Sequence, residues 1–240
     1  MYQPAFSLLK QTVKDANEID QLKDVLVEMK RHLHLDLTYV STYIPDQGTN
    51  SPVLTTYEPT WVARYVRCNY FLVDPIVIES RARILPLDWS EIDQTRPTAA
   101  RFFSAARDHG VGGSGLTVPI RGWFGEQALF SIASTAGIRE WKRVSDSILP
   151  DLVLFSQYFH TSVMFLSGYA PSSDRRALSK REKECLELVA GGMKAKAVSA
   201  RLQISESAVR VYLAAARKKL QCSTLSQAVA KATRLSLIHG

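Results

Sequence analysis

The stretch LSKREKECLELVAGGMKAKAVSARLQISESAVRVYLAAARKKL, residues 178–220, decides the fold of the carboxyl-terminal part of the chain. Ser179 and Glu182 have the spacing of a capping box, in which the hydroxyl caps one backbone N–H and the glutamate reaches back to another. Apolar residues at helical spacing follow, and Gly191 and Gly192 predict the end of this first helix.

Two further helices and a turn follow in the same stretch. A second helix is expected at about 195–202, and Ser205 is placed to cap a third helix at about 206–220. A fourth amphipathic segment, 224–238, comes next. Short helices separated by tight breaks in this order predict a helix-turn-helix domain that binds double-stranded DNA.

The third helix carries the residues expected to contact DNA. Its apolar side chains lie on one face, whereas Arg210 lies on a narrow polar face from which arginine can bond guanine O6 and N7 in the major groove. A basic cluster at its end suits phosphates. We predict six DNA contacts, from Ser205, Ser207, Arg210, Arg217, Lys218 and Lys219. The alternative is a solvated basic helix in an ordinary helical domain.

The positive charge of the chain is concentrated in this part. Residues 168–240 hold 14 Lys and Arg against 5 Asp and Glu, a net charge of +9. Residues 1–167 hold 16 against 18, a net charge of −2. Such a division is expected when one domain alone contacts a polyanion.

The amino-terminal part predicts a mixture of helices and antiparallel strands. Helices are expected at 20–33, 59–67, 97–109 and 139–166, and strands at 37–44, 116–120 and 128–133, with a turn at 121–126 between the last two. Strands segregated from helices predict an α/β/α sandwich built on an antiparallel sheet, so the whole chain is of the α+β class.

The two parts are joined by a segment with the composition of a flexible linker. Residues 168–176 read GYAPSSDRR, which is small, polar and contains proline. We therefore expect a ligand-binding domain at 1–167, a linker at 168–176 and the helix-turn-helix domain at 177–240.

Targeting signals and disulfides are not expected. Residues 1–14 lack the basic start and apolar block of a signal peptide, and the apolar run 148–170 has the spacing of a buried helix rather than of a membrane span. The three cysteines form no CxxC pair, which favours a reducing compartment. These features predict a cytoplasmic protein without a membrane partner.

No catalytic or metal-binding pattern emerges. GVGGSG at 110–115 matches GxGxxG, but it follows a helix and precedes a strand, the reverse of the dinucleotide-binding order. A hydrolase elbow at Ser114 would need glycine at position 116, where the chain has Leu116, and the five histidines have no metal-ligand spacing. We expect no catalytic residues, no metal and no cofactor.

An aromatic stretch at 57–89 is the strongest candidate for a binding site in the amino-terminal part. Tyr57, Trp61 and Tyr65 are four residues apart, so their side chains share one helical face. Asp74 stands among apolar residues, where a carboxylate needs a partner. Two interpretations are open: an aromatic core in which Asp74 caps the helix after Pro75, or an apolar pocket with a few inward polar groups that binds a small molecule.

This set of residues resembles the LuxR family of quorum-sensing regulators. The spacing W-x3-Y-x8-D-P-x13-W, from Trp61 to Trp89, is similar to that family's domain for acyl-homoserine lactones. The glycine of SGLTVP, and Glu182, Leu186 and Gly192 downstream, extend the resemblance over nearly the whole chain.

The resemblance implies a role for each candidate residue. Trp61 would donate to the lactone carbonyl, Asp74 would accept from the amide N–H of the ligand, and Tyr57 and Ser131 would bond the acyl carbonyl. Tyr65 and Trp89 would wall the pocket. Arg210 would contact bases, and 224–238 would be the helix through which two DNA-binding domains pair.

The resulting hypothesis is a ligand-responsive transcription factor. It would bind an acyl- or aroyl-homoserine lactone, read a roughly palindromic site as a homodimer, and act with RNA polymerase. Three alternatives are weighed beside it: a regulator that binds DNA without ligand and is released by it, a lactone- or amide-processing enzyme with an appended DNA domain, and a phosphorylation-driven response regulator. The second lacks a nucleophile–base pair, and the third lacks alternating parallel β and α elements.

Overall fold

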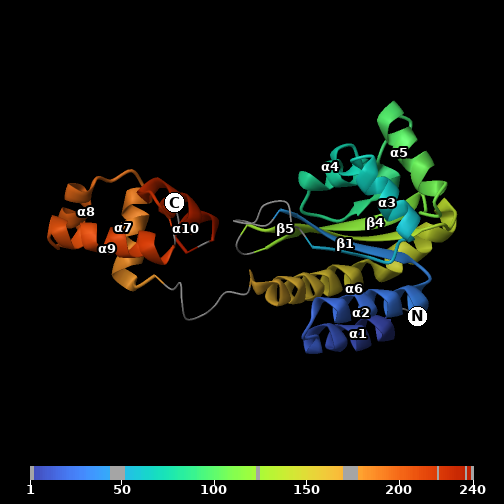
Figure 1. Ribbon diagram of the computed structural model, residues 1–240, viewed down its shortest axis with the longest axis horizontal. Helices are drawn as coiled ribbons and strands as arrows, with labels where there is room; N and C mark the ends of the chain where they lie inside the picture. Colours follow the sequence, from blue (N-terminus) through green and yellow to red (C-terminus); the bar gives the residue numbers. More distant parts are fainter. Residues whose placement is uncertain are drawn as a thin grey trace. The chain divides into compact units, whose positions relative to one another are not determined.

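The computed structural model describes residues 3–43, 52–122, 125–169, 178–220, 222–235 and 237–238. They form two compact units that divide near residue 170 (Figure 1). Most of the expected linker, residues 170–176, lies outside the described residues. Gly168 and Tyr169 end a π-helical turn, Phe165–Tyr169, in which Gly168 has a non-helical φ of +80°. The domain limits 1–167, 168–176 and 177–240 stay predictions.

The first unit is built on one five-stranded antiparallel sheet. Its strands are β1 (Asp36–Tyr43), β2 (Val53–Thr55), β3 (Leu87–Asp88), β4 (Ser114–Arg121) and β5 (Gln127–Ser134), in the order β2-β1-β5-β4-β3. Because side chains alternate across a strand, β1 sends Leu37 and Tyr39 to one face and Thr38 to the other.

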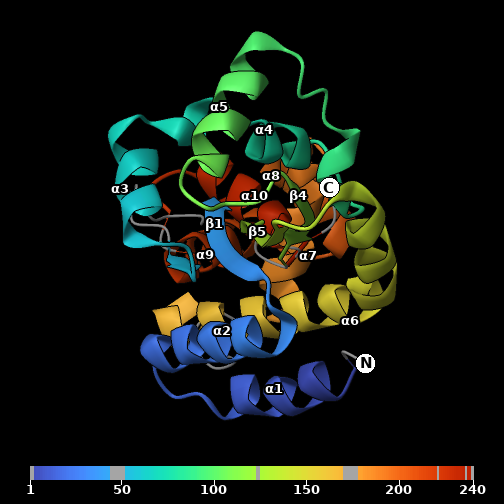
Figure 2. The ribbon, with the colours of Figure 1, turned by 90° about the vertical axis from the view of Figure 1, so that its right-hand side faces the viewer.

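Helices α1 (Gln3–Asp15), α2 (Ile19–Leu33) and α6 (Ile138–Met164) cover one face of the sheet (Figure 2). The core between them is apolar and aromatic: Phe130 of β5 packs edge-on against Phe155 and Phe159 of α6, with ring centroids 5.7 and 5.4 Å apart. This layer is the main hydrophobic core of the unit.

Helices α3 (Pro59–Arg67), α4 (Pro75–Arg81) and α5 (Pro97–Arg107) cover the other face, so the predicted α/β/α sandwich is confirmed. Each begins with proline at a position whose backbone N–H has no partner within the helix. Short 3-10 turns, Tyr70–Leu72 and Trp89–Glu91, follow α3 and β3.

Two helices and two strands of this unit were not clearly predicted from the sequence. The sequence pattern did not indicate α1, and β2 and β3, with three and two residues, are too short to show alternation. Helix α4 was expected only under the interpretation in which Asp74 is a cap. Other elements differ from expectation by one or two residues at their ends, and Ile44 lies outside the described residues.

The second unit contains the four predicted helices, α7 (Lys180–Ala190), α8 (Ala195–Leu202), α9 (Glu206–Lys219) and α10 (Leu225–Arg234). The last of them ends at Arg234, before the end of the expected segment 224–238. The capping box forms as expected: Glu182 N donates to Ser179 Oγ at 3.3 Å, and Ser179 N donates to Glu182 Oε2 at 2.7 Å. Gly192 has a φ of +86°, a conformation that favours glycine, and it follows the end of α7. Leu186, Val209 and other apolar residues form the core of this unit.

Candidate ligand-binding and DNA-binding sites

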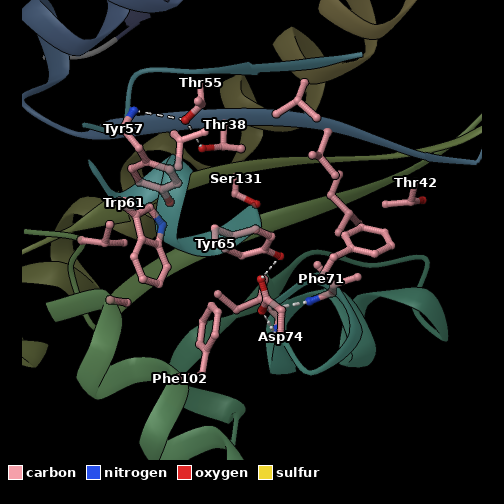
Figure 3. A pocket seen from close by; sticks show the side chains of 18 of the residues that line it. Thr38, Thr42, Thr55, Tyr57, Trp61, Tyr65, Phe71, Asp74, Phe102 and Ser131 are labelled. Carbon is pink, nitrogen blue, oxygen red and sulfur yellow. Dashed lines mark hydrogen bonds between the residues drawn. The ribbon is translucent and has the colours of Figure 1, made fainter. Parts of the chain in front are cut away.

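A cavity of about 640 Å³ lies in the first unit, between the sheet and helices α3–α5. It is lined mainly by apolar and aromatic side chains. All six residues predicted to bind ligand line it: Tyr57, Trp61, Tyr65, Asp74, Trp89 and Ser131. Figure 3 shows the five of them other than Trp89. The structure therefore brings together residues that are up to 74 positions apart in the sequence.

Asp74 caps a helix and also lines the cavity. Its Oδ1 accepts from the backbone N–H groups of Ile76 at 2.8 Å and Val77 at 3.4 Å, so it caps α4. Its Oδ2 accepts from the Tyr65 hydroxyl at 2.8 Å, and the residue also lines the cavity. A carboxylate offers about four acceptor positions, so one remains for a ligand donor.

Burial controls the proton affinity of this carboxyl. Asp74 is 6% exposed, and desolvation raises its pKa to about 6, although the hydrogen bonds from Tyr65, Ile76 and Val77 act to lower it. Desolvation also raises the pKa of the Tyr65 hydroxyl, and the negative charge of Asp74 raises it further. Tyr65 therefore stays protonated and is the donor of the pair.

Trp61 supplies an unused hydrogen-bond donor. Its ring packs against Tyr65, Tyr70 and Phe102 at centroid distances of 5.9, 5.6 and 5.9 Å, which holds the indole in place. Figure 3 shows the indole nitrogen on the cavity side of the ring, without a hydrogen bond to any of the described residues drawn there. An indole nitrogen can only donate, so a ligand acceptor would complete it.

A row of hydroxyl groups crosses the sheet at the cavity. In the strand register Thr38 pairs with Thr55 and with Ser131, and Ser131 pairs with Thr117. The hydroxyls of Thr38 and Thr55 are 2.8 Å apart, and those of Thr117 and Ser131 are 2.9 Å apart. No local pattern in the sequence indicates the three threonines, because only the register of four strands places them in one row with Ser131.

Trp89 forms part of the cavity wall, and its indole N–H already donates a hydrogen bond within the protein. The indole N–H donates to Thr117 Oγ1 at 2.9 Å. Gly115 makes room for this ring, because a Cβ at that position would lie 2.7 Å from Trp89 ring atoms and 2.5 Å from the Ile132 carbonyl oxygen. The glycine of SGLTVP is thus explained by close packing.

The residues predicted to contact DNA lie on α9 and at its two ends. Ser205 caps the helix by accepting from Ala208 N at 3.1 Å, and Arg210 forms an ion pair of 2.7 Å with Glu206 one turn earlier. Five of the six predicted residues are exposed: Ser205, Ser207, Arg210, Arg217 and Lys218. Their contacts with DNA stay predictions.

Lys219 differs from its neighbours. Its ammonium group lies 2.7 Å from Glu182 Oε2, the same oxygen that closes the capping box of α7. Glu182 is buried, so this ion pair joins the end of α9 to the start of α7. The geometry favours an internal structural role for Lys219 over the predicted phosphate contact, because a paired lysine would have to leave a buried carboxylate.

Two negative findings concern the described residues only. Among residues 3–43, 52–122, 125–169 and the described part of the second unit, no group of His, Cys, Asp and Glu could hold a metal ion. Within the same ranges no helix combines the length and apolar character needed to span a membrane.

GVGGSG connects α5 to β4, which is the helix-to-strand order expected from the sequence.

Comparison with known protein families agrees with both sites. Residues 19–163 match the autoinducer binding domain, and residues 176–232 match the domain described as bacterial regulatory proteins, luxR family. The chain belongs to the LuxR family. The transcriptional activator protein RaiR of Rhizobium etli is 40% identical over 179 residues, which cover 75% of this chain and 74% of RaiR. CarR of Pectobacterium carotovorum, also a transcriptional activator protein, is 30% identical over 202 residues, or 80% and 82% of the two chains.

The fold of this LuxR-family chain is similar to that of a solved relative. The crystal structure of Escherichia coli SdiA covers the full length of both chains with a TM-score of 0.73 at 20% identity. The family membership confirms the predictions of a transcription regulator with an autoinducer-binding domain and a helix-turn-helix domain, and it favours a regulator over an enzyme.

Proposed function

We propose that this regulator binds an N-acyl- or N-aroyl-homoserine lactone in the cavity of its first unit and controls promoters as a cytoplasmic homodimer. The single observation that carries this proposal is the set of polar groups around the cavity: donors at Trp61, Tyr57 and Ser131, and an acceptor at Asp74. A homoserine lactone with an acylated amine presents the complementary set, two carbonyl acceptors and one amide donor.

The positions of these groups support one orientation of the ligand. The lactone carbonyl would accept from the unused N–H of Trp61, and the amide N–H would donate to the remaining acceptor position of Asp74. The acyl carbonyl would then face Tyr57 and Ser131. The acyl or aroyl tail would lie along apolar lining residues of the same cavity, which include Val40, Val53, Val62, Val66 and Leu129.

A ligand of this kind would also stabilise the fold. Burial raises the pKa of Asp74, so its ionised form lacks some of the solvation it would have in water. An amide N–H that donates to this carboxylate replaces part of that solvation. A ligand at a thousandfold excess over its Kd stabilises the native state by about 4 kcal/mol, which is a large share of the stability of a typical domain.

The second unit supports DNA recognition by two copies. Its basic residues and the exposed polar face of α9 suit a major groove, and a twofold dimer places one such helix on each half of a roughly palindromic site. Pairing through α10, which the resemblance implies, and contact with RNA polymerase belong to the same proposal.

The test is to purify the full chain from cells grown with and without a mixed panel of acyl- and aroyl-homoserine lactones and to analyse its extracts by mass spectrometry. The panel includes octanoyl-glycerol, because SdiA has been solved in complex with octanoyl-rac-glycerol. We expect one lactone in stoichiometric amount and more protein from that culture. Trp61→Phe, which keeps the aromatic bulk and loses the donor, should recover less of the same lactone.

The other outcomes have distinct meanings. Equal yields of empty protein, with DNA protection lost when lactone is added, would support the alternative regulator that ligand releases. A bound acyl-glycerol without lactone would contradict the proposed ligand class. Footprints that are identical with and without ligand would contradict both modes of regulation.

A further inference from the structure

The hydroxyl of Ser131 lies between the cavity and a buried hydrogen-bond chain. Ser131 lines the cavity, whereas Thr117, its cross-strand partner, is fully buried behind it and does not line the cavity. Thr117 Oγ1 lies 2.9 Å from Trp89 Nε1 and 2.9 Å from Ser131 Oγ. The chain therefore runs from Trp89 through Thr117 to Ser131.

The direction of this chain follows from the chemistry of its first member. An indole nitrogen can only donate, so Thr117 Oγ1 accepts from Trp89. The hydroxyl proton of Thr117 is buried and needs an acceptor. Among the residues that the structure describes, Ser131 Oγ is its one acceptor within hydrogen-bond distance. If Ser131 donated to Thr117 instead, the Thr117 proton would be buried without a partner, which is costly.

We infer that Trp89 and Thr117 form a proton-ordered relay that fixes the Ser131 hydroxyl as a hydrogen-bond donor into the cavity. Thr117 accepts from Trp89 and donates to Ser131, so the proton of Ser131 is left to point into the cavity. Thr117 is a positioning residue: it does not line the cavity, and it acts on the ligand through Ser131.

The relay restricts the chemistry of the bound molecule. The ligand atom opposite Ser131 has to be an acceptor, such as a carbonyl oxygen, because a donor there would face another donor. This inference rests on the proposed function, in which that atom is the acyl carbonyl oxygen. A signal with a group at the same position that can only donate, such as an amide N–H or an ammonium, would bind more weakly.

The first test is a double-mutant cycle on lactone affinity, with the lactone recovered from the wild-type protein as the probe. Thr117→Val removes the relay and keeps the side-chain shape. We expect it to weaken binding by on the order of fivefold, the value of one neutral hydrogen bond. In the Ser131→Ala background the same change should have almost no effect, because the group that it orients is missing. Thr117→Ser should restore affinity.

A matched control separates positioning from simple damage to the cavity. Thr42→Val is the same substitution at a residue that, unlike Thr117, lines the cavity, and its hydroxyl donates to the Gln127 carbonyl oxygen at 3.3 Å instead of to Ser131. Its effect on affinity should be equal in the wild-type and Ser131→Ala backgrounds. Equal losses for Thr117→Val in both backgrounds would overturn the relay.

A second measurement needs neither a ligand nor a variant. In the ligand-free full chain the relay places the hydroxyl proton of Thr117 in a buried hydrogen bond and that of Ser131 in the cavity. NMR should therefore detect a slowly exchanging Thr117 hydroxyl proton and a rapidly exchanging Ser131 hydroxyl proton. The reverse pattern would refute the relay. If the wild-type protein binds no lactone, the proposed function fails, and this exchange pattern alone decides whether the relay exists.

Discussion

The Tyr65 hydroxyl donates a 2.8 Å hydrogen bond to Asp74 Oδ2, while Asp74 Oδ1 caps helix α4. One carboxylate thus joins the aromatic face of α3 to the start of α4 and keeps an acceptor for the cavity. A change at Asp74 is therefore expected to alter ligand binding, and its effect on the fold depends on whether the cap survives.

Asp74→Asn separates these two roles. Asparagine is an equally good helix cap, so the unfolding free energy of the ligand-free chain should change little. The charge-assisted bond to the ligand amide is lost, which should weaken the ligand response by about 1.5–3 kcal/mol. A dose–response curve in a promoter reporter measures this. Asp88→Asn is the matched control, since Asp88 caps the turn that begins at Trp89 and does not line the cavity. Wild-type sensitivity of Asp74→Asn would refute the role.

Lactone affinity should depend on pH through Asp74. In the free protein burial raises its pKa to about 6, and an amide donor that bonds the carboxylate lowers that pKa in the complex. The affinity for the lactone should therefore be highest above about pH 6. Below about pH 6 it should fall, by at most about tenfold per pH unit. Titration calorimetry from about pH 4.5 to about pH 8 measures this dependence. The salt concentration is held constant so that electrostatic screening is the same at every pH.

Tyr65→Phe is expected to shift the midpoint of this pH profile in a known direction. It removes the hydroxyl that favours the ionised form of Asp74, so the pKa of Asp74 should rise and the midpoint of the affinity profile should move to higher pH. Asp74→Asn should flatten the profile. A midpoint that is unmoved in Tyr65→Phe would show that another group controls the dependence.

Lys218 and Lys219 are neighbours, but substitutions at them are expected to change different properties. Lys218 is exposed, so Lys218→Ala should weaken binding to all DNA sequences and reduce the slope of log K against log salt by about one. Lys219 pairs with buried Glu182, so Lys219→Ala should lower the unfolding free energy by about 1–3 kcal/mol and leave the salt slope nearly unchanged. Fluorescence anisotropy over a salt series and thermal unfolding test both; equal salt slopes for the two variants would contradict the distinction.

Arg210 is expected to read one base step. Its guanidinium is exposed and is held by Glu206 at 2.7 Å on the same side of α9. Arg210→Ala should cost about 1–3 kcal/mol and relax the preference at one position of the site. Selection from a randomised DNA pool measures this, with Arg201→Ala, an exposed arginine of α8, as the control. An unaltered profile for Arg210→Ala would exclude the contact.

Gly115→Ala tests the packing that positions Trp89. A Cβ there would come within 2.7 Å of the Trp89 ring and 2.5 Å of a backbone oxygen, so the strand or the ring has to move. We expect a loss of about 1–3 kcal/mol in unfolding free energy and weaker ligand binding. Gly113→Ala, whose Cβ would meet only Arg107 side-chain atoms at 3.5 and 3.9 Å, should be nearly neutral. Equal melting temperatures for the two variants would contradict the close fit.

Features that depend on neighbours along the chain could be predicted from the sequence. The four helices of the second unit, the capping box of Ser179 and Glu182 and the Ser205 cap all follow from local hydrogen bonds and from apolar residues at helical spacing. The candidate residues from Tyr57 to Trp89 were recognised by their spacing, and Asp74 could be named because a carboxylate among apolar residues needs partners.

Features that depend on the pairing of distant strands and helices could not be predicted from the sequence. The register of β1, β2, β4 and β5 aligns Thr38, Thr55 and Thr117 with Ser131, and no local pattern in the sequence encodes that row. Edge strands of two and three residues acquire their shape from the strands they join. The different environments of Lys218 and Lys219 likewise arise from the packing of α9 against α7, because adjacent residues on a helix point in different directions.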